Sequence, residues 1–156
     1  MMEVNSVTIC DKVAVMNDGY IHQIEKPFNL MNKPSTLFVS TFILGNNVLD
    51  ISYKDGLILS LLGNIKVSDF PEKASTKYLS ISPKFISIDK SSEGRFIVIS
   101  KEFLGDFYMY KVLLNDLSIR VSADIKNNLE VGDKCNLKLI KNGVFFLYPG
   151  GFKNII

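Results

Sequence analysis

A pair of carboxylates is the first candidate for chemistry in this sequence. Glu102 and Asp106 bracket the tripeptide Phe103-Leu104-Gly105. Two carboxylates that approach each other can move protons on a substrate or hold a hard cation. Such a cation requires further oxygen ligands, and no third oxygen donor lies nearby in the sequence. We therefore expect this stretch to be a solvated connection between two strands.

The other reactive side chains occur singly. His22 is the only histidine, so a metal site or a catalytic base would have no partner cluster around it. We interpret it as an ordinary surface histidine on a hairpin strand whose Ile21 and Ile24 face the core. Cys135 lies on the apolar side of an alternating strand, which favours a small core residue over a nucleophile.

Nucleotide and nucleic-acid chemistry have little support. The sequence contains no Gly-x-x-x-x-Gly-Lys-Ser/Thr loop, so this chain alone cannot hydrolyse ATP by that mechanism. The chain carries 18 basic and 16 acidic residues, a net charge of +2, which is far from the basic footprint of a dedicated nucleic-acid binder. We expect the strand aromatics to pack a core rather than stack on bases; they are Phe96, Phe103, Phe107, Tyr108 and Tyr110.

Length and composition indicate what class of protein carries these residues. A length of 156 residues with 47% hydrophobic residues and a mean hydropathy of +0.18 suits one domain with a small appendage and a real core. Cys10 and Cys135 lie far apart, which predicts free thiols in a reducing, cytoplasmic compartment. The apolar runs 96–99 and 144–148 are too short to cross a bilayer, so we expect no direct membrane insertion.

The first 45 residues predict a hairpin and two short helices. Asn17-Asp18-Gly19 supplies the positive-φ residues of a tight turn between strands at 13–16 and 20–24. A first helix begins at Pro27, because proline suits the first helical position, and stops before Pro34. Ser35 can cap a second helix, which ends at Gly45. Its apolar residues are Phe38, Val39, Phe42 and Ile43.

From Asn46 onward the hydrophobic period changes to two, which is typical of half-buried antiparallel strands. Turn sequences such as Asp55-Gly56 and Asn142-Gly143 separate the strands. The pattern predicts a mainly β fold, with an oligonucleotide/oligosaccharide-binding (OB) type Greek-key barrel from Tyr78 onward. The expected strands are 49–53, 57–61, 78–82, 95–101, 107–114, 117–123, 135–140 and 144–148.

Residues 11–47 resemble a segment of ATP-binding-cassette (ABC) importer ATPases that carry a C-terminal transport-associated OB (TOBE) domain. In that family an Asp-Arg-Ile/Val-x-Val-Met-x-x-Gly-x-Ile-x-Gln-x-Gly-x-Pro run precedes a spaced proline and Phe-Val-x-x-Phe-Ile-Gly. The matching residues are Asp11, Lys12, Val13, Val15, Met16, Gly19, Ile21, Gln23 and Pro27, then Pro34, Phe38, Val39, Phe42, Ile43 and Asn47. The departures are Glu25, Met31 and Leu44.

A weaker resemblance continues through the rest of the chain. Ser82-Pro83-Lys84 stands where TOBE regions often carry Arg-Pro-Glu, and the stretches 102–106 and 130–139 resemble their Phe-Leu-Gly-Asp and Gly-Asp turns. The resemblance implies that residues 1–45 are the remnant of an ABC ATPase domain. Residues 46–156 would form a TOBE regulatory domain.

The resemblance implies a C-terminal fragment of an importer ATPase of the spermidine/putrescine, iron(III) or sugar type, which is not catalytic in isolation. It needs no cofactor of its own, whereas the parent protein would use ATP and Mg²⁺. The expected partners are a second copy, the missing ATPase domain and a membrane permease, which would hold the protein at the inner face of the cell membrane. Phe38, Val39, Phe42 and Ile43 would pack against the ATPase core or in the dimer.

Two alternatives remain beside this regulatory and dimerising role. A small-ligand sensor could bind an oxyanion through backbone N–H groups in the turns at 102–106 or at Gly132-Asp133. An OB-type nucleic-acid-binding module is the other, and it would require a salt-sensitive affinity for single-stranded DNA.

Overall fold

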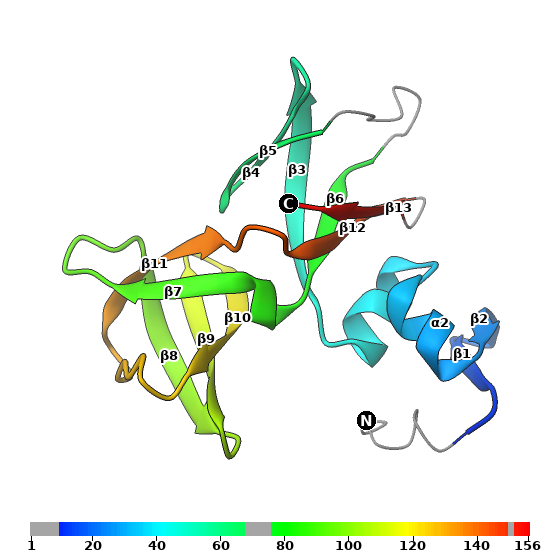
Figure 1. The fold of residues 1–156 in the computed structure, drawn as a ribbon, viewed down its shortest axis with the longest axis horizontal. Helices are drawn as coiled ribbons and strands as arrows, with labels where there is room; N and C mark the ends of the chain where they lie inside the picture. Colours follow the sequence, from blue (N-terminus) through cyan, green and yellow to red (C-terminus); the bar gives the residue numbers. More distant parts are fainter. Residues whose placement is uncertain (1–9, 68–75, 150–151) are drawn as a thin grey trace.

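The computed structural model describes residues 10–67, 76–149 and 152–156, which form a small N-terminal unit and two antiparallel sheets (Figure 1). Residues 1–9, which belong to the expected ATPase remnant, and residues 68–75 and 150–151 lie outside the described residues. The N-terminal unit, residues 10–45, contains β1 (Val13–Asn17), β2 (Tyr20–Glu25), the helix α2 (Pro27–Asn32) and the π-helical turn η1 (Val39–Ile43). Its own core consists of five buried side chains, Val13, Val15, Leu30, Val39 and Ile43.

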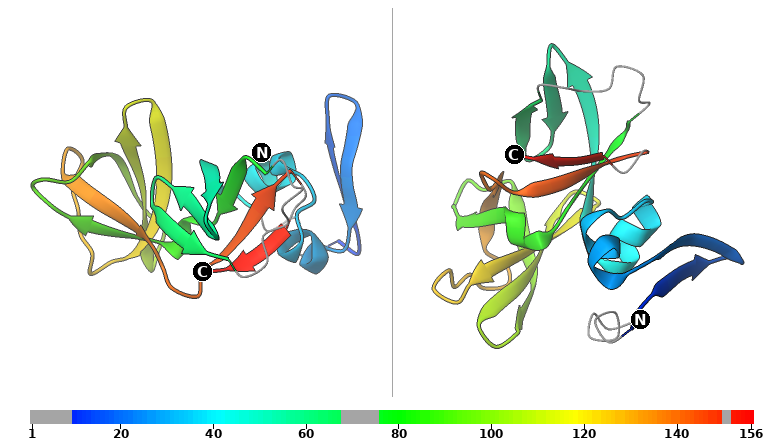
Figure 2. Two further views of the ribbon diagram at one scale, coloured as in Figure 1. Left: turned by 90° about the horizontal axis from the view of Figure 1, so that it is seen from above. Right: turned by 45° about the vertical axis from the view of Figure 1, so that its right-hand side comes forward.

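The hairpin forms where the sequence predicts it. Asp18 and Gly19 have φ angles of 49° and 79°, the two positive values that a two-residue turn matched to strand twist requires. The β1–β2 pair carries one register shift between Val15 and Met16. In both views of Figure 2 the hairpin lies at the far end of the molecule from the barrel.

The second helix begins with a different cap from the one predicted. Thr36 Oγ1 accepts the Val39 N–H at 3.2 Å, whereas Ser35 is occupied by Gln23, whose Oε1 accepts the Ser35 N–H at 2.9 Å. The prediction that Ser35 caps this helix is therefore wrong. Gly45 ends the helix as expected, with a φ of 63° and its N–H donated to the Thr41 carbonyl at 3.0 Å.

Five strands form the OB-like half-barrel in the order β10-β9-β8-β11-β7. Strands β8, β9 and β10 are joined by consecutive hairpins, and β11 returns beside β8, which is the Greek-key order. The two edge strands, β7 and β10, contact each other, so the sheet curls toward closure. The strands are β7 (Ile86–Lys90), β8 (Phe96–Phe103), β9 (Phe107–Leu114), β10 (Leu117–Asp124) and β11 (Lys134–Leu139).

The second sheet has six strands in the order β13-β12-β6-β3-β4-β5. Apolar side chains from both sheets belong to one continuous core, in which Cys135 is fully buried, as predicted. Burial raises the pKa of its thiol to about 11. The strands are β3 (Asn47–Lys54), β4 (Leu57–Ser60), β5 (Gly63–Lys66), β6 (Tyr78–Ile81), β12 (Val144–Tyr148) and β13 (Phe152–Ile155).

The mainly β, OB-like fold is confirmed, but the barrel contains different strands from those predicted. The 3₁₀ turn η2 (Pro83–Phe85) leads from β6 into β7, a strand that the alternation did not reveal. Strands β6 and β12 were expected in the barrel and instead lie inside the second sheet, where each pairs with two neighbouring strands. The reason is visible in β12, where four consecutive residues are buried, because strands covered on both faces lose their alternation.

Candidate functional site

The junction between the N-terminal unit and the second sheet brings together the most sequence-distant residues. Leu79 and Phe145 point into the main core, while Ser80 and Phe146, on the opposite face of the same strands, point toward residues 30–46. The hydroxyls of Ser80 and Ser40 are hydrogen-bonded at 2.5 Å, and both residues are fully buried. The junction is therefore a packed interface.

Tyr148 makes a second link across the junction. Its hydroxyl donates to the Pro34 carbonyl at 2.6 Å. The side chain is only 2% exposed, and burial raises the pKa of the phenol to about 12 because the phenolate would lose its hydration. The neutral phenol is the form that can donate this hydrogen bond.

Asn47 fastens the start of β3 to the half-barrel. Its amide Nδ2 donates to the Arg120 carbonyl at 2.7 Å, and its Oδ1 accepts the Arg120 N–H at 2.8 Å. This pair of bonds reproduces with a side chain what two paired strands exchange through their backbones. The segment that leads from the N-terminal unit into β3 is therefore held by hydrogen bonds at both ends, to the second sheet and to the half-barrel.

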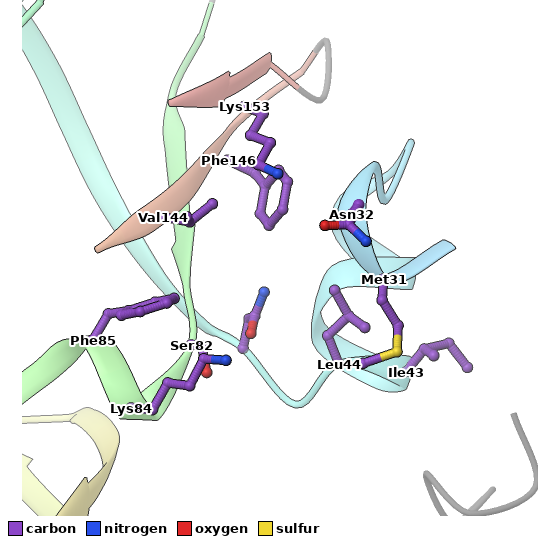
Figure 3. Close-up of a pocket in the computed structure, with 11 residues that line it drawn as sticks. Met31, Asn32, Ile43, Leu44, Ser82, Lys84, Phe85, Val144, Phe146 and Lys153 are labelled. Carbon is purple, nitrogen blue, oxygen red and sulfur yellow. The ribbon is translucent and has the colours of Figure 1, made fainter. Parts of the chain in front are cut away.

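An open cavity of about 260 Å³ lies in this junction (Figure 3). Its apolar wall comes from both units, and its polar residues include two lysines at Lys84 and Lys153. The lining side chains are Met31, Asn32, Ile43, Leu44, Asn46, Ser82, Lys84, Phe85, Val144, Phe146 and Lys153. Ser82 and Lys84 are the positions where the sequence departs from Arg-Pro-Glu; no sequence signal pointed to Lys153.

The four helix residues expected at an interface divide into two pairs. Val39 and Ile43 are buried in the core of the N-terminal unit itself. Phe38 and Phe42 stack with ring centroids 5.1 Å apart, and Phe42 is 49% exposed. Of these residues, Phe42 presents the largest accessible surface to a further partner.

His22 packs against this aromatic pair. Its ring lies 4.7 Å from that of Phe38, and its Nδ1 is 3.2 Å from Thr36 Oγ1. The expectation that Ile21 and Ile24 face the core is wrong, because they are 56% and 55% exposed. The rest of the N-terminal unit covers only one face of the hairpin, so Val13 and Val15 of β1 are buried while β2 has no fully buried residue.

The 102–106 stretch forms the turn between β8 and β9. The Leu104 N–H donates to the Phe107 carbonyl at 2.9 Å, and Gly105 has a φ of 101°. Glu102, Phe103, Leu104, Gly105 and Asp106 are all exposed, with the Phe103 ring 5.6 Å from that of Tyr108. Among the described residues, no group of three or more His, Cys, Asp or Glu side chains could hold a metal ion.

The Gly132-Asp133 turn uses its backbone donors internally. The Gly132 N–H donates to the Val98 carbonyl at 2.8 Å, and the Asp133 N–H to the Glu130 carbonyl at 3.0 Å. The Asp133 carboxylate accepts the Glu130 N–H at 2.8 Å and pairs with Lys90 at 2.9 Å. These contacts lower the pKa of Asp133, the Glu130 hydrogen bond most and Lys90 next. Neither N–H group is left to bind an oxyanion.

No helix in the described ranges is long and apolar enough to cross a membrane. No protein-family model matches the chain.

Curated relatives match part of the chain. The spermidine/putrescine import ATP-binding protein PotA of Borreliella afzelii is 42% identical over 59 residues, 38% of this chain and 17% of the relative. The protein of the same name from Bacillus thuringiensis subsp. konkukian is 37% identical over 73 residues, 47% of this chain and 22% of the relative. The chain thus spans about a fifth of the length of these relatives. Over the matched part, the chain is homologous to these import ATP-binding proteins.

Proposed function

We propose that this chain is a regulatory and dimerising part of the ATP-binding subunit of an ABC importer and is not itself catalytic. The observation that carries the proposal is the 37–43% identity to import ATP-binding proteins over 58–73 residues. The OB-like half-barrel agrees with a TOBE domain following the N-terminal unit.

The exposed apolar surface of the N-terminal unit indicates that another protein surface covers it. Met16, Tyr20, Ile21 and Ile24 are 59%, 76%, 56% and 55% exposed, and all four lie on the hairpin. An apolar surface of this extent on so small a unit is typical of a protein–protein contact. In the proposal its partner is the ATPase core of the subunit.

The remaining parts of the proposal follow from this role. ATP and Mg²⁺ bind elsewhere in the subunit, since the sequence has no phosphate-binding loop. The subunit works in the cytoplasm and reaches the inner face of the membrane through a permease. A second copy of the chain, rather than nucleic acid, is its partner within the ATPase pair.

A chimera tests the proposal. The matching segment of the Borreliella afzelii relative and the residues that follow it are replaced by the whole 156-residue chain, and ATP hydrolysis and molar mass are measured. We expect a dimer with an ATPase rate within a few fold of the relative's own. The double variant Ile21→Asp, Ile24→Asp should disrupt both properties.

The matched control is Ile97→Asp, because Ile97 is 44% exposed on the half-barrel, away from the hairpin. It should leave the chimera active. A chimera that is dimeric and active with aspartate at both hairpin positions would contradict the proposed docking. A folded chimera with no ATPase activity would contradict the functional assignment itself.

A further inference from the structure

We propose that the junction cavity binds a small organic anion, a carboxylate or phosphate monoester with an apolar body. The proposal goes beyond the regulatory role above, since that role requires no ligand. It also places the ligand away from the two turns that the sequence suggested for an oxyanion.

The charge of the cavity selects for an anion. Lys84 and Lys153 both line it, and none of its lining residues is acidic. Within the described residues, neither lysine has a carboxylate within 4.0 Å, whereas Lys90 and Lys101 are both paired. The Nζ of Lys84 makes a cation–π contact with the Phe85 ring, whose centroid lies 5.0 Å away. Two cationic side chains beside an open cavity attract an anion and repel a polyamine.

The walls select for an apolar body attached to that anion. The apolar lining residues include Met31, Leu44, Phe85, Val144 and Phe146 (Figure 3). A cavity of about 260 Å³ lies just below the common range of roughly 300–1,000 Å³ for small-molecule sites. An inorganic anion would leave this wall uncovered, so it would bind more weakly than a monoester of the same charge.

The polar side chains of the cavity are held by their own elements. Asn46 Nδ2 donates to Ser40 Oγ at 3.0 Å, and Asn32 Nδ2 donates to the Phe28 carbonyl at 2.8 Å. These bonds fix the two amides before any ligand arrives, which lowers the entropy lost on binding. Ser82 adds a hydroxyl on the side of η2.

A ligand in this cavity would touch both halves of the molecule. Met31, Ile43 and Leu44 belong to the N-terminal unit, while Val144 and Phe146 belong to β12. Its contacts would stabilise the junction in the arrangement described here, because a ligand stabilises the state to which it binds. If the proposed function holds, this coupling would connect an anion signal to the surface that faces the ATPase core.

The experiment uses phenyl phosphate as the probe, titrated into the whole 156-residue chain in a calorimeter. We expect saturable binding, weaker binding of inorganic phosphate and none of spermidine. The double variant Lys84→Met, Lys153→Met removes both charges and keeps the length of the side chains. It should weaken binding by about tenfold or more. Val144→Phe, which fills the cavity, should abolish binding.

Lys138→Met is the matched control, because Lys138 is exposed on β11 and does not line the cavity. It should bind phenyl phosphate as the unchanged chain does, and thermal melting should show that each variant is folded. Absence of saturable binding would overturn the inference, as would equal affinity in the double-lysine variant or equal binding of spermidine. None of these outcomes bears on the chimera, so the two proposals can fail separately.

Discussion

The half-barrel and the N-terminal unit differ in how completely they bury their apolar side chains. The half-barrel shares a core with the second sheet, and its inner residues Ile88, Val98, Val112 and Ile119 are at most 1% exposed. The N-terminal unit has a core of five buried side chains and keeps a row of exposed apolar residues on its hairpin. Since stability grows with buried apolar area, the half-barrel should be the stable part and the N-terminal unit the part that depends on its neighbours.

The variants with the largest expected effect create one cavity in each region and so test this difference. Ile88→Ala in the half-barrel should lower the free energy of global unfolding by about 2–5 kcal/mol, because it removes fully buried methyl groups. Leu30→Ala, equally buried in the N-terminal unit, should act mainly by opening that unit. Urea unfolding gives the global value, and amide hydrogen exchange gives the local one. Equal global losses from the two variants would show that the regions unfold as one.

A second variant cuts the fastening between the regions. Asn47→Ala leaves the N–H and carbonyl of Arg120 without the side-chain partners they have now. We expect a loss of about 1 kcal/mol in urea unfolding, toward the lower end of the penalty for unsatisfied polar groups because these bonds are only partly buried. Asn64→Ala, on an exposed position of β5, is the control and should stay within about 0.5 kcal/mol. If Asn47→Ala is equally neutral, water replaces the lost amide and the fastening is not specific.

The exposed hairpin surface sharpens the comparison in solution. In the absence of the ATPase core, we expect the isolated chain to form a dimer through the apolar surface that its hairpin leaves uncovered. Ile21→Asp with Ile24→Asp should weaken association by about tenfold or more, since each isoleucine loses its burial in the dimer. Light scattering over a concentration series measures this. A monomeric mass of the unsubstituted chain at all concentrations would contradict the prediction.

The smallest expected effect concerns pH and the half-barrel. The pKa of Asp133 lies below its usual value of 3.8, so the ionised form is favoured by folding. Its contribution is present above pH 3.8 and is lost as the pH falls through the lower folded value. Asp133→Asn should therefore flatten the fall in urea midpoint below about pH 4. An identical slope in the two proteins would show that the contacts with Glu130 and Lys90 do not stabilise the fold.

Some features could be predicted because they depend on a few adjacent residues. The turns at Asp18-Gly19 and Asp55-Gly56 have positive φ at both positions, as their sequences indicate. Gly45 ends its helix, and Cys135 is buried on the apolar side of its strand. The cap at Thr36 was missed because Ser35 is an equally good cap by type, and Gln23, twelve residues earlier, occupies it.

The candidate site could be predicted only in part. Ser82 and Lys84 were noticed as departures from a family pattern, but their partner across the cavity, Lys153, lies about seventy residues away in the chain. No feature of the sequence indicated that the N–H groups of Gly132 and Asp133 donate to the carbonyls of Val98 and Glu130. Such assignments depend on which strands become neighbours.

By itself, the sequence determined the local conformations: where turns reverse the chain, where helices stop and which strands alternate. These are decided by backbone sterics and short-range patterning within a few residues. Only the tertiary structure decided the strand order β10-β9-β8-β11-β7, the burial of β6 and β12 on both faces, and the cavity between Met31 and Lys153. The reason is that long-range pairing is set by the burial of the whole chain against the entropy of closing its loops, which no short window of sequence contains.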